Sequence, residues 1–378
     1  MDMQFKYEKQ RTDHLLVASV LLLVALGLVT LYSASYAFAQ RWFNGDGLYL
    51  VTRQAVLGLV GIVLFFIFSV VDLDLLRKFI KPLVFGSILL CALAFVPGIG
   101  VNINGASRWI GFGSFTYQPS ELVKLVLPLY LAHYFEKKKN GTSNLTRSII
   151  PPALITGVFF VLIFLQNNFS TAVFLAFNAL FIFFLAGVRF RYFFGALLMF
   201  LPTAALLVLQ KEHRVRRFIS YIHPDFEPQG ASYQVNSSIL SISSGGFWGK
   251  GIGQGTRKIA GVPEIHSDFI FSSFAEEMGF LGVMFFFMLF AVFAVRGYID
   301  SMNNERPFNR LLGCGLVTII ITQALLNIAV TAGALPATGI PLPFFSAGGS
   351  SLATTLIMVG LVVNVSRTSK NRVYKEES

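Results

Sequence analysis

The stretch that decides the fold is residues 149–188, IIPPALITGVFFVLIFLQNNFSTAVFLAFNALFIFFLAGV. It contains no Asp, Glu, Lys or Arg, and only a short polar turn around Asn167 and Asn168 interrupts it. A helix needs roughly 20 apolar residues to cross the hydrocarbon core of a bilayer. The two halves are each close to that length, so the sequence predicts two membrane-spanning helices joined by a tight turn at a membrane face.

Similar apolar runs recur along the whole chain. Of its 378 residues, 54% are hydrophobic and only 13% are charged, which is too little charge for a soluble surface. We therefore expect an all-α integral membrane protein with one polytopic domain, residues 1–378, and about ten transmembrane helices. The predicted spans are 14–36, 54–71, 80–97, 119–135, 149–166, 170–188, 191–209, 269–295, 311–332 and 349–366.

The uneven distribution of Lys and Arg over the loops predicts the orientation. With the amino terminus inside, the inner segments carry most of the cations, and the short outer loops carry only Arg41, Arg53 and Arg108. Both termini are therefore expected to be cytoplasmic, in the plasma membrane. The first apolar run is longer than the hydrophobic region of a signal peptide, about 7–15 residues, so we interpret it as an uncleaved span; a cleaved signal peptide is the alternative.

A large extracytoplasmic loop, residues 210–268, is predicted between the seventh and eighth spans. It is rich in cations, although long loops are exempt from the charge rule. An anionic lipid headgroup or a pyrophosphate would match them, and cations that merely snorkel to the interface are the alternative. The net charge of +11 does not indicate nucleic acid, because the basic residues form short clusters between apolar runs. The cations of the loop are Lys211, Arg214, Arg216, Arg217, Lys250, Arg257 and Lys258.

Two opposite charges open the fourth span. Glu121 and Lys124 are three residues apart, which places them on one face of a helix. Each charge in hydrocarbon costs about 2.5–3.5 kcal/mol on insertion scales, so we predict that they pair and face a polar cavity. A purely structural ion pair is the alternative. Pro119 suits the first helical turn, and Ser120 or Gln118 can cap it.

A carboxylate marks the boundary between the outer loop and the eighth span. Asp268 would be partly desolvated there, in a position suited to a general base. It would serve equally well as the amino-terminal cap of the helix, and the sequence leaves both roles open. Glu276 and Glu277 lie within the same span and also need a polar cavity.

Two irregular segments flank the last spans. Residues 243–255, SSGGFWGKGIGQG, match neither a P-loop nor G-x-G-x-x-G, so they indicate no nucleotide site. Their glycines are expected to let the backbone approach a lipid headgroup or fold back on the membrane. Residues 339–351 predict irregular backbone packed against protein or a wet cavity. No His/Cys cluster has zinc spacing, and Cys91 and Cys314 lie inside apolar runs, so no metal site or disulfide is predicted.

Taken together, these motifs resemble the SEDS family (shape, elongation, division and sporulation), which includes RodA and FtsW. The resemblance covers about residues 14–367. It rests on residues 105–109 (GASRW), 118–124 (QPSELVK), Tyr233-Gln234, 243–255, 263–271 (PEIHSDFIF), 276–279 (EEMG) and 341–351 (PLPFFSAGGSS).

Some positions distinguish this chain within the family. Residues 251–255 (GIGQG) and Lys258 are more similar to FtsW than to RodA. Asn168 stands where an acid is usual, which puts a charge role there in doubt. Ser267 replaces the usual Thr, and Ala347 replaces a common aromatic residue.

The resemblance implies a peptidoglycan glycosyltransferase that polymerises lipid II into glycan strands on the outer face of the plasma membrane, in cell division or elongation. It implies that Asp268 is the catalytic aspartate and that Glu121 and Lys124 line the cavity. The implied partners are lipid II, polyprenyl-pyrophosphate-linked glycan, a class B penicillin-binding protein that cross-links the strands, and other divisome or elongasome membrane proteins. The further candidates for substrate binding are Arg108, Gln118, Ser120, Arg214, Arg217, Gln234, Lys250, Lys258, Glu277, Ser346 and Ser350.

The chemistry agrees with this implication. Pyrophosphate leaves readily once its charge is neutralised, so one base suffices, in contrast to the carboxylate pair of glycosidases. Asp268 would take the proton of the acceptor hydroxyl, while Arg and Lys, with or without a divalent cation (Mg or Mn), hold the leaving group. The rival functions are a lipid II flippase, which intramembrane charges would suit, and a non-catalytic scaffold for a penicillin-binding protein. The absence of an internal repeat and the gathering of polar residues on one face favour the enzyme.

Overall fold

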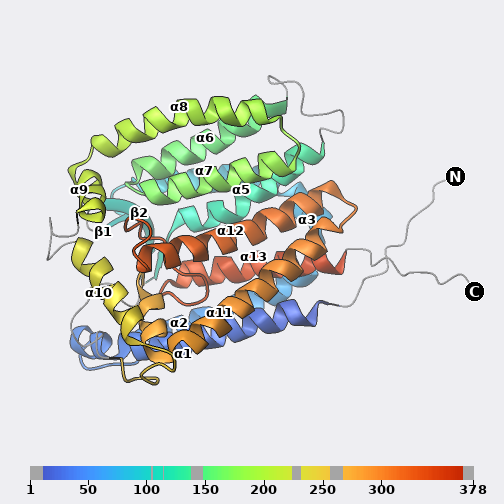
Figure 1. The fold of residues 1–378 in the computed structure, drawn as a ribbon. Coiled ribbons are helices and arrows are strands. Elements are labelled where there is room, and N and C mark those ends of the chain that lie inside the picture. Colours follow the sequence, from blue (N-terminus) through green and yellow to red (C-terminus); the bar gives the residue numbers. More distant parts are fainter. Residues whose placement is uncertain are drawn as a thin grey trace, which may run out of the picture.

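The computed structural model describes residues 12–103, 105–113, 115–137, 148–223, 231–255 and 267–368. Within them the chain is mostly helical (Figure 1). The elements are α1 (His14–Trp42), α2 (Tyr49–Val70), α3 (Leu73–Lys78), α4 (Ile80–Leu93), β1 (Gly100–Ile103), β2 (Ala106–Phe112), β3 (Phe115–Tyr117), α5 (Pro119–Glu136), α6 (Ile150–Leu165), α7 (Phe169–Leu185), α8 (Phe190–Leu209), α9 (Glu212–Ile222), α10 (Ala231–Ser244), α11 (Ile270–Met302), α12 (Pro307–Thr331) and α13 (Gly349–Arg367).

The long helices run side by side as a bundle (Figure 1). Helices α5, α12 and α13 lie between a group formed by α1, α2 and α11 and a group formed by α6, α7 and α8. Strands β1 and β2 and helices α9 and α10 lie together at one end, which we call the sheet end. Helix α3 and the connection between α11 and α12 lie at the other, the α3 end.

Helices occupy all ten positions where the sequence predicts a span. The largest differences are at the ends of α1 and α11, which extend to Trp42 and Met302 rather than to residues 36 and 295. By length and hydropathy alone, five helices of the described part can cross a membrane: α1, α2, α11, α12 and α13. The helical integral membrane fold is therefore confirmed, while ten crossings stay a prediction.

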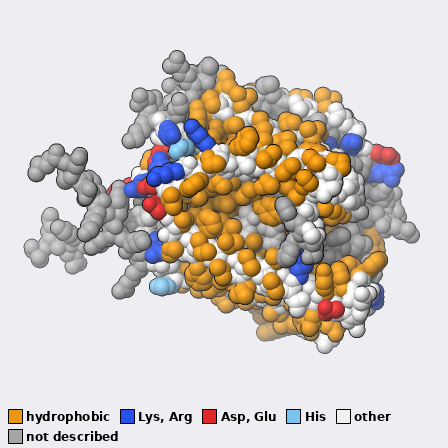
Figure 2. Space-filling view, turned by 180° about the vertical axis from the view of Figure 1, so that it is seen from behind, with side chains coloured by type: hydrophobic (Ala, Val, Ile, Leu, Met, Phe, Trp, Pro, Cys, Tyr) orange, Lys and Arg blue, Asp and Glu red, His pale blue; other side chains and the backbone are white. Residues whose placement is uncertain are grey.

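The surface of the bundle is suited to lipid. In Figure 2, hydrophobic side chains cover the middle of the molecule, and Lys, Arg, Asp and Glu gather toward its two ends. Large apolar side chains such as Leu59, Phe85, Leu154 and Phe190 are exposed on the helices. A protein in water would bury such side chains, whereas a bilayer solvates them.

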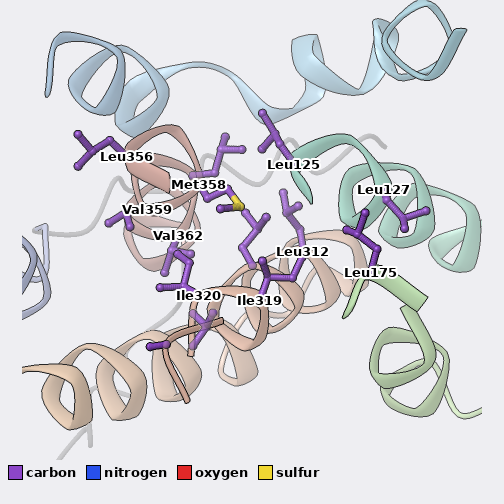
Figure 3. Packing of buried hydrophobic residues seen from close by; sticks show 14 of the residues in the cluster. Leu125, Leu127, Leu175, Leu312, Ile319, Ile320, Leu356, Met358, Val359 and Val362 are labelled. Atoms are coloured by element: carbon purple, nitrogen blue, oxygen red, sulfur yellow. The ribbon is translucent and has the colours of Figure 1, made fainter. Parts of the chain in front are cut away.

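The core lies where α12 and α13 meet α5 and α7. Figure 3 shows Leu125 of α5, Leu175 of α7, Ile319 of α12 and Val359 of α13 in one buried cluster. Helices α2 and α13 approach closely because Gly360 has no side chain: a Cβ there would lie 2.6 Å from the carbonyl oxygen of Phe65. Small residues commonly permit such close packing of membrane helices.

The sequence did not predict the three-stranded antiparallel sheet in residues 100–117. Strand β2 pairs with β1 on one side, Val101 opposite Trp109, and with β3 on the other, Ile110 opposite Tyr117. Glycines with positive φ, Gly105 and Gly113, stand in its two tight connections. The large predicted loop of residues 210–268 contains two helices, α9 and α10, that the sequence did not predict.

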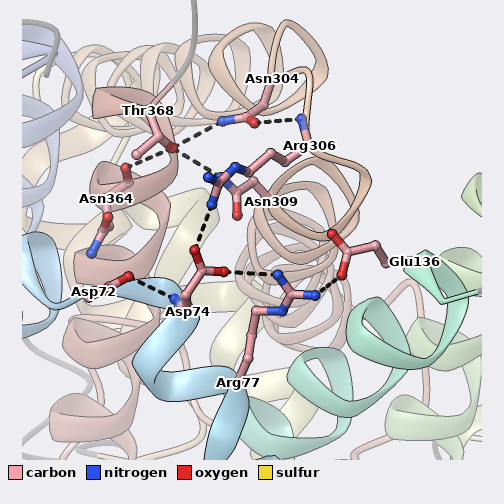
Figure 4. Close-up of polar contacts among 9 residues, drawn as sticks. All are labelled: Asp72, Asp74, Arg77, Glu136, Asn304, Arg306, Asn309, Asn364 and Thr368. Carbon is pink, nitrogen blue, oxygen red and sulfur yellow. Dashed lines mark hydrogen bonds and ion pairs between the residues drawn. The ribbon is translucent and has the colours of Figure 1, made fainter. Parts of the chain in front are cut away.

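Charged side chains tie the helices together at the α3 end (Figure 4). The carboxylate of Asp74 lies 2.9 Å from Arg77 and 2.9 Å from Arg306, and Arg77 also pairs with Glu136 of α5. Burial alone would raise the pKa of Asp74, but the hydrogen bonds from both arginines outweigh it and lower the pKa. The network therefore joins α3, α5 and the start of α12.

The amino-terminal end of α1 and the carboxy-terminal end of α13 lie at the same end of the bundle. Asp13, the amino-terminal cap of α1, forms an ion pair of 2.5 Å with Arg296 near the end of α11. Asn304, just after α11, donates a hydrogen bond of 3.1 Å to the carbonyl of Val365 near the end of α13. This placement agrees with an even number of crossings.

Candidate active site

A cavity of about 630 Å³ opens at the sheet end. Its walls come from β2, the turn between α6 and α7 with the start of α7, helices α9 and α12, and residues 335–340. The lining is mainly apolar. Among the described residues that line it, the charged side chains are Arg108, Arg214 and Arg217, so the cavity is apolar with a cationic rim.

Arg108 is held by the turn that precedes α7. Its guanidinium donates a hydrogen bond to the carbonyl of Asn167, whose side-chain amide in turn donates to the carbonyl of Gly105 at 2.9 Å. Asn167 has a φ of 60°, in the left-handed region that Asn tolerates better than most residues. These two hydrogen bonds tie the sheet to the α6–α7 turn and thereby fix the position of Arg108.

Helix α9 supplies the other two arginines. The Arg214 guanidinium is nearly buried and lies 4.8 Å from the ring centroid of Phe164 and 5.3 Å from that of Phe169, in cation–π geometry. Arg217 is exposed, and its Nη1 lies 3.4 Å from the carbonyl of Ala337. The amphipathic helix thus turns its cationic face toward the cavity.

The electrostatics of this group favour an anion. Burial, and then repulsion by Arg217 and Arg214, lowers the pKa of Arg108, while attraction by Asp268 partly offsets these effects. Burial also lowers the pKa of Arg214. Since arginine remains protonated in proteins, the three like charges repel one another, and a bound anion would relieve that repulsion.

Asp268 packs against the segment that forms one wall of the cavity. A Cβ on Gly339 would come within 3.4 Å of Oδ2 of Asp268, so the carboxylate packs against the backbone at residue 339. The neighbouring Thr338 and Ile340 line the cavity. The attraction between Asp268 and Arg108 agrees with a carboxylate near this wall, and the role of Asp268 stays a prediction.

The helix after Asp268 starts one residue later than the cap role of Asp268 would require. Helix α11 begins at Ile270, and its amino-terminal cap is Phe269. The backbone of Asp268 is held by Asn327, whose side-chain amide donates a hydrogen bond of 2.8 Å to the Asp268 carbonyl. The hydroxyl of Ser346 donates to the carbonyl of Ser267 at 2.5 Å. The predicted substrate contact Ser346 therefore has a positioning role in this structure.

The predicted pair of Glu121 and Lys124 is present. The ammonium of Lys124 lies 2.7 Å from Oε1 of Glu121 and 2.9 Å from Oε1 of Gln323, and both charged side chains are almost completely buried. Pro119 occupies the first turn of α5, and Gln118 is the cap residue but bonds to the Ser120 hydroxyl rather than to the helix backbone.

The pair lies behind the wall of the cavity rather than on its surface. Lys124 is 5.9 Å from the ring of Phe174, which lines the cavity, whereas Lys124 itself does not. Gln323 continues the network with a hydrogen bond of 2.9 Å to the carbonyl of Pro341. The pair does not line this cavity and instead supports the segment that packs on Asp268; that it faces a polar cavity stays a prediction.

Lys250 and Glu277 belong to a separate cluster. Lys250 forms an ion pair of 2.7 Å with the buried Glu276, and the hydroxyl of Ser33 in α1 donates to Glu277 at 2.5 Å. Neither Lys250 nor Glu277 lines the 630 Å³ cavity. Their role in substrate binding stays a prediction.

The glycine-rich segment explains this separation. It packs against a kink of α11 at Gly279, whose φ of 62° is not helical. The amide of Phe280 donates to the carbonyl of Gly246 at 2.9 Å, and that of Lys250 donates to the carbonyl of Glu276 at 3.0 Å. The glycines let the backbone approach α11, while the predicted approach to a headgroup stays a prediction.

The remaining predicted residues are scattered. Gln234 lies half-buried on α10, and Ser350 lies in the first turn of α13; neither lines the 630 Å³ cavity. Lys258 lies outside the described residues. No group of three or more His, Cys, Asp or Glu that could hold a metal occurs in the described part of the chain.

Sequence reasoning missed a polar face on α12. Gln323, Asn327 and Thr331 are buried, and Asn327 donates to the carbonyls of both Asp268 and Ile340. Their spacing of four residues places them on one helix face. Polar residues at this spacing in an apolar span were a signal that the sequence already carried.

Comparison with known proteins extends over nearly the whole chain. A family model described as "Cell cycle protein", FTSW_RODA_SPOVE, matches residues 13–371. The chain is 35% identical to the probable peptidoglycan glycosyltransferase FtsW of Geobacter metallireducens, covering 98% of this chain and 99% of that protein. It is 37% identical to the corresponding protein of Borreliella burgdorferi, with 96% and 98% covered. It is 34% identical to the stage V sporulation protein E of Bacillus subtilis, with 96% and 99% covered.

Solved structures agree with these relatives. A chain from a study of polymerization and crosslinking by a peptidoglycan synthase complex superposes with a TM-score of 0.78 at 31% identity, covering 94% of this chain and 98% of that one. The rod shape determining protein RodA of Thermus thermophilus superposes with a TM-score of 0.71 at 31% identity, covering 95% and 98%.

Proposed function

Since the chain belongs to the family of cell cycle proteins that includes FtsW, RodA and SpoVE, we propose that it is a peptidoglycan glycosyltransferase of cell division. Its substrate is lipid II, and its donor is a glycan on a polyprenyl pyrophosphate. The observation that carries the proposal is that Arg108 and two arginines of α9 line one cavity, next to the segment around Gly339 that packs on Asp268.

Asp268 is the general base in this proposal. It accepts the proton of the acceptor hydroxyl as that oxygen forms the new glycosidic bond to the anomeric carbon. The bond between that carbon and the pyrophosphate oxygen breaks, and the bonding electrons leave with the pyrophosphate. One carboxylate is enough because the leaving group needs charge neutralisation rather than a proton.

Arg108, Arg214 and Arg217 supply that neutralisation. The cavity brings the three cations together in an apolar surround, where electrostatic stabilisation is stronger than in water. The apolar wall, which includes Val173, Leu325 and other side chains of α7 and α12, suits the first isoprene units of the carrier lipid. Phosphate and lipid of one substrate are thus matched by two parts of one cavity.

The topology and the partner belong to the same proposal. The sheet end faces the outside of the plasma membrane, where lipid II is polymerised, and both termini are cytoplasmic. A class B penicillin-binding protein cross-links the strands beside it, together with other membrane proteins of division. The likeness to a chain from a peptidoglycan synthase complex supports a partner of this kind.

The direct test is polymerisation of fluorescent lipid II by the purified full-length chain in detergent. Glycan strands that a lysozyme-type hydrolase digests are the expected product. A flippase would move lipid II across a vesicle membrane without forming strands. A scaffold would form none by itself but would stimulate a penicillin-binding protein that has its own polymerase activity.

A further inference from the structure

The first turn of α7 faces the cavity with unusual hydrogen-bonding capacity. Asn168, Phe169 and Ser170 all line the cavity, and α7 begins at Phe169. The first backbone hydrogen bond of the helix runs from the amide of Ala172 to the carbonyl of Asn168, 3.1 Å. The amides that precede it have no acceptor within the helix, as at every helix start.

Asn168 supplies the second, independent observation. It is the cap residue of α7, yet its side chain makes no capping hydrogen bond. The side chain is 95% buried, with 5% relative exposure, and its Nδ2 has no hydrogen-bond partner among the described residues. A buried amide donor without an acceptor destabilises the folded protein, so a ligand oxygen that accepts from Nδ2 would remove this penalty.

Two guanidinium groups flank this turn. Arg108 donates to the carbonyl of Asn167, directly before the helix, and Arg214 stacks on the ring of Phe169, its first residue. The helix start carries a partial positive charge of its own. Amide donors, a helix dipole and two arginines therefore converge on one corner of an apolar cavity, which is how proteins bind phosphate.

We propose that the start of α7, with the side-chain amide of Asn168, is the subsite that holds a phosphate of the pyrophosphate leaving group. This inference rests on the proposed transfer from a polyprenyl pyrophosphate. Asn168 donates to a phosphate oxygen through Nδ2, and the first amides of α7 donate to the same group. Arg108 and Arg214 neutralise it from either side. Asn168 is neutral, so this subsite binds its anion without a divalent cation at position 168.

The test is binding of farnesyl pyrophosphate to the full-length chain in detergent with a chelator present, measured by isothermal titration calorimetry. Farnesyl monophosphate, farnesol and phosphatidylglycerol are the comparison ligands. Replacing Asn168 with Ala should weaken farnesyl pyrophosphate binding by about 10-fold or more and leave farnesol binding unchanged. Equal loss for phosphatidylglycerol would identify a general headgroup site and overturn the assignment to a leaving group.

Asn309→Ala is the matched control, since Asn309 is another buried asparagine but lies at the α3 end. It should leave farnesyl pyrophosphate affinity within about 2-fold. A second variant, Asn168→Asp, keeps the size and a good helix cap. It should lose affinity in the chelator by at least as much as the Ala variant, and Mg²⁺ should restore it.

The outcomes separate the subsite from the proposed function. If the wild-type chain polymerises lipid II and both Asn168 variants bind farnesyl pyrophosphate like wild type, the subsite is wrong and the function stands. If the wild-type chain neither binds farnesyl pyrophosphate nor polymerises lipid II, the proposed function itself fails.

Discussion

The ammonium of Lys124 lies 2.7 Å from the carboxylate of Glu121, and both side chains are at most 3% exposed. Lys124 also reaches Gln323, which holds the carbonyl of Pro341. The pair is therefore the base of a network that ends at residues 339–346, the segment packed on Asp268.

This burial predicts an asymmetric response to mutation. Lys124→Met should destabilise the protein by about 3–5 kcal/mol, because it leaves Glu121 charged and unpaired in low dielectric. The double variant Glu121→Gln with Lys124→Met should be more stable than the single variant. Thermal unfolding in detergent measures both, and equal melting temperatures of the two variants and wild type would argue against a buried pair.

The charges at the α3 end predict a pH dependence. The two arginines hold the pKa of Asp74 below its ordinary value, which is about 3.9 in an unfolded chain. Its contribution to stability is therefore present above about pH 4 and disappears as the pH falls through the lower folded pKa. The Asp74 side chain is 48% exposed, so the effect should stay below about 1 kcal/mol.

The measurement compares melting temperatures of wild type and Asp74→Asn. Wild type should be the more stable protein at pH 7, and the difference should shrink as the pH falls below about 4. A difference that persists unchanged at pH 3 would mean that the charge of Asp74 contributes nothing.

Two glycines test the packing of the bundle. A Cβ on Gly360 would meet the Phe65 carbonyl at 2.6 Å, whereas Gly157 of α6 has nothing within 4 Å of the corresponding position. Gly360→Ala should cost about 1–3 kcal/mol through overpacking. Gly157→Ala should be neutral or slightly stabilising, because Ala favours helix over Gly. Similar melting temperatures for the two variants would contradict the close contact of α2 and α13.

Cysteine labelling tests the orientation. Both native cysteines are buried, while Ser243 of α10 and Asn303 after α11 are exposed at opposite ends. A membrane-impermeant thiol reagent should label Ser243→Cys in intact cells and Asn303→Cys only after permeabilisation. The reverse pattern would place the cavity on the cytoplasmic face and exclude polymerisation outside.

Local sequence patterns predicted much of this fold. Apolar length located the helices at all ten predicted spans, and three-residue spacing identified the Glu121–Lys124 pair. Of the cations singled out in the sequence, Arg214 and Arg217 of the long loop and Arg108 of the short loop before α5 line one cavity. These features depend on residues close together in the chain, where period and charge are informative.

The features that the sequence did not predict depend on contacts between segments that are distant in the chain. In the sequence, Lys250 and Arg217 are both simply cations of the long loop. In the structure, the glycine-rich segment packs at the kink of Gly279, and Lys250 there pairs with Glu276. The sheet forms from three short strands whose pairing no single strand predicts. Asp268 precedes the cap of α11 by one residue, a margin that sequence alone does not resolve.

The central claim is that Asp268 accepts the proton of the acceptor hydroxyl, and Asp268→Asn tests it most directly. Asn keeps the size of the side chain, and the backbone contact to Asn327 remains, so folding should be preserved. The purified variant should melt within a few degrees of wild type, while its polymerisation of fluorescent lipid II should fall by about 10²-fold or more. Full polymerisation by well-folded Asp268→Asn protein would contradict the account and remove Asp268 from the mechanism.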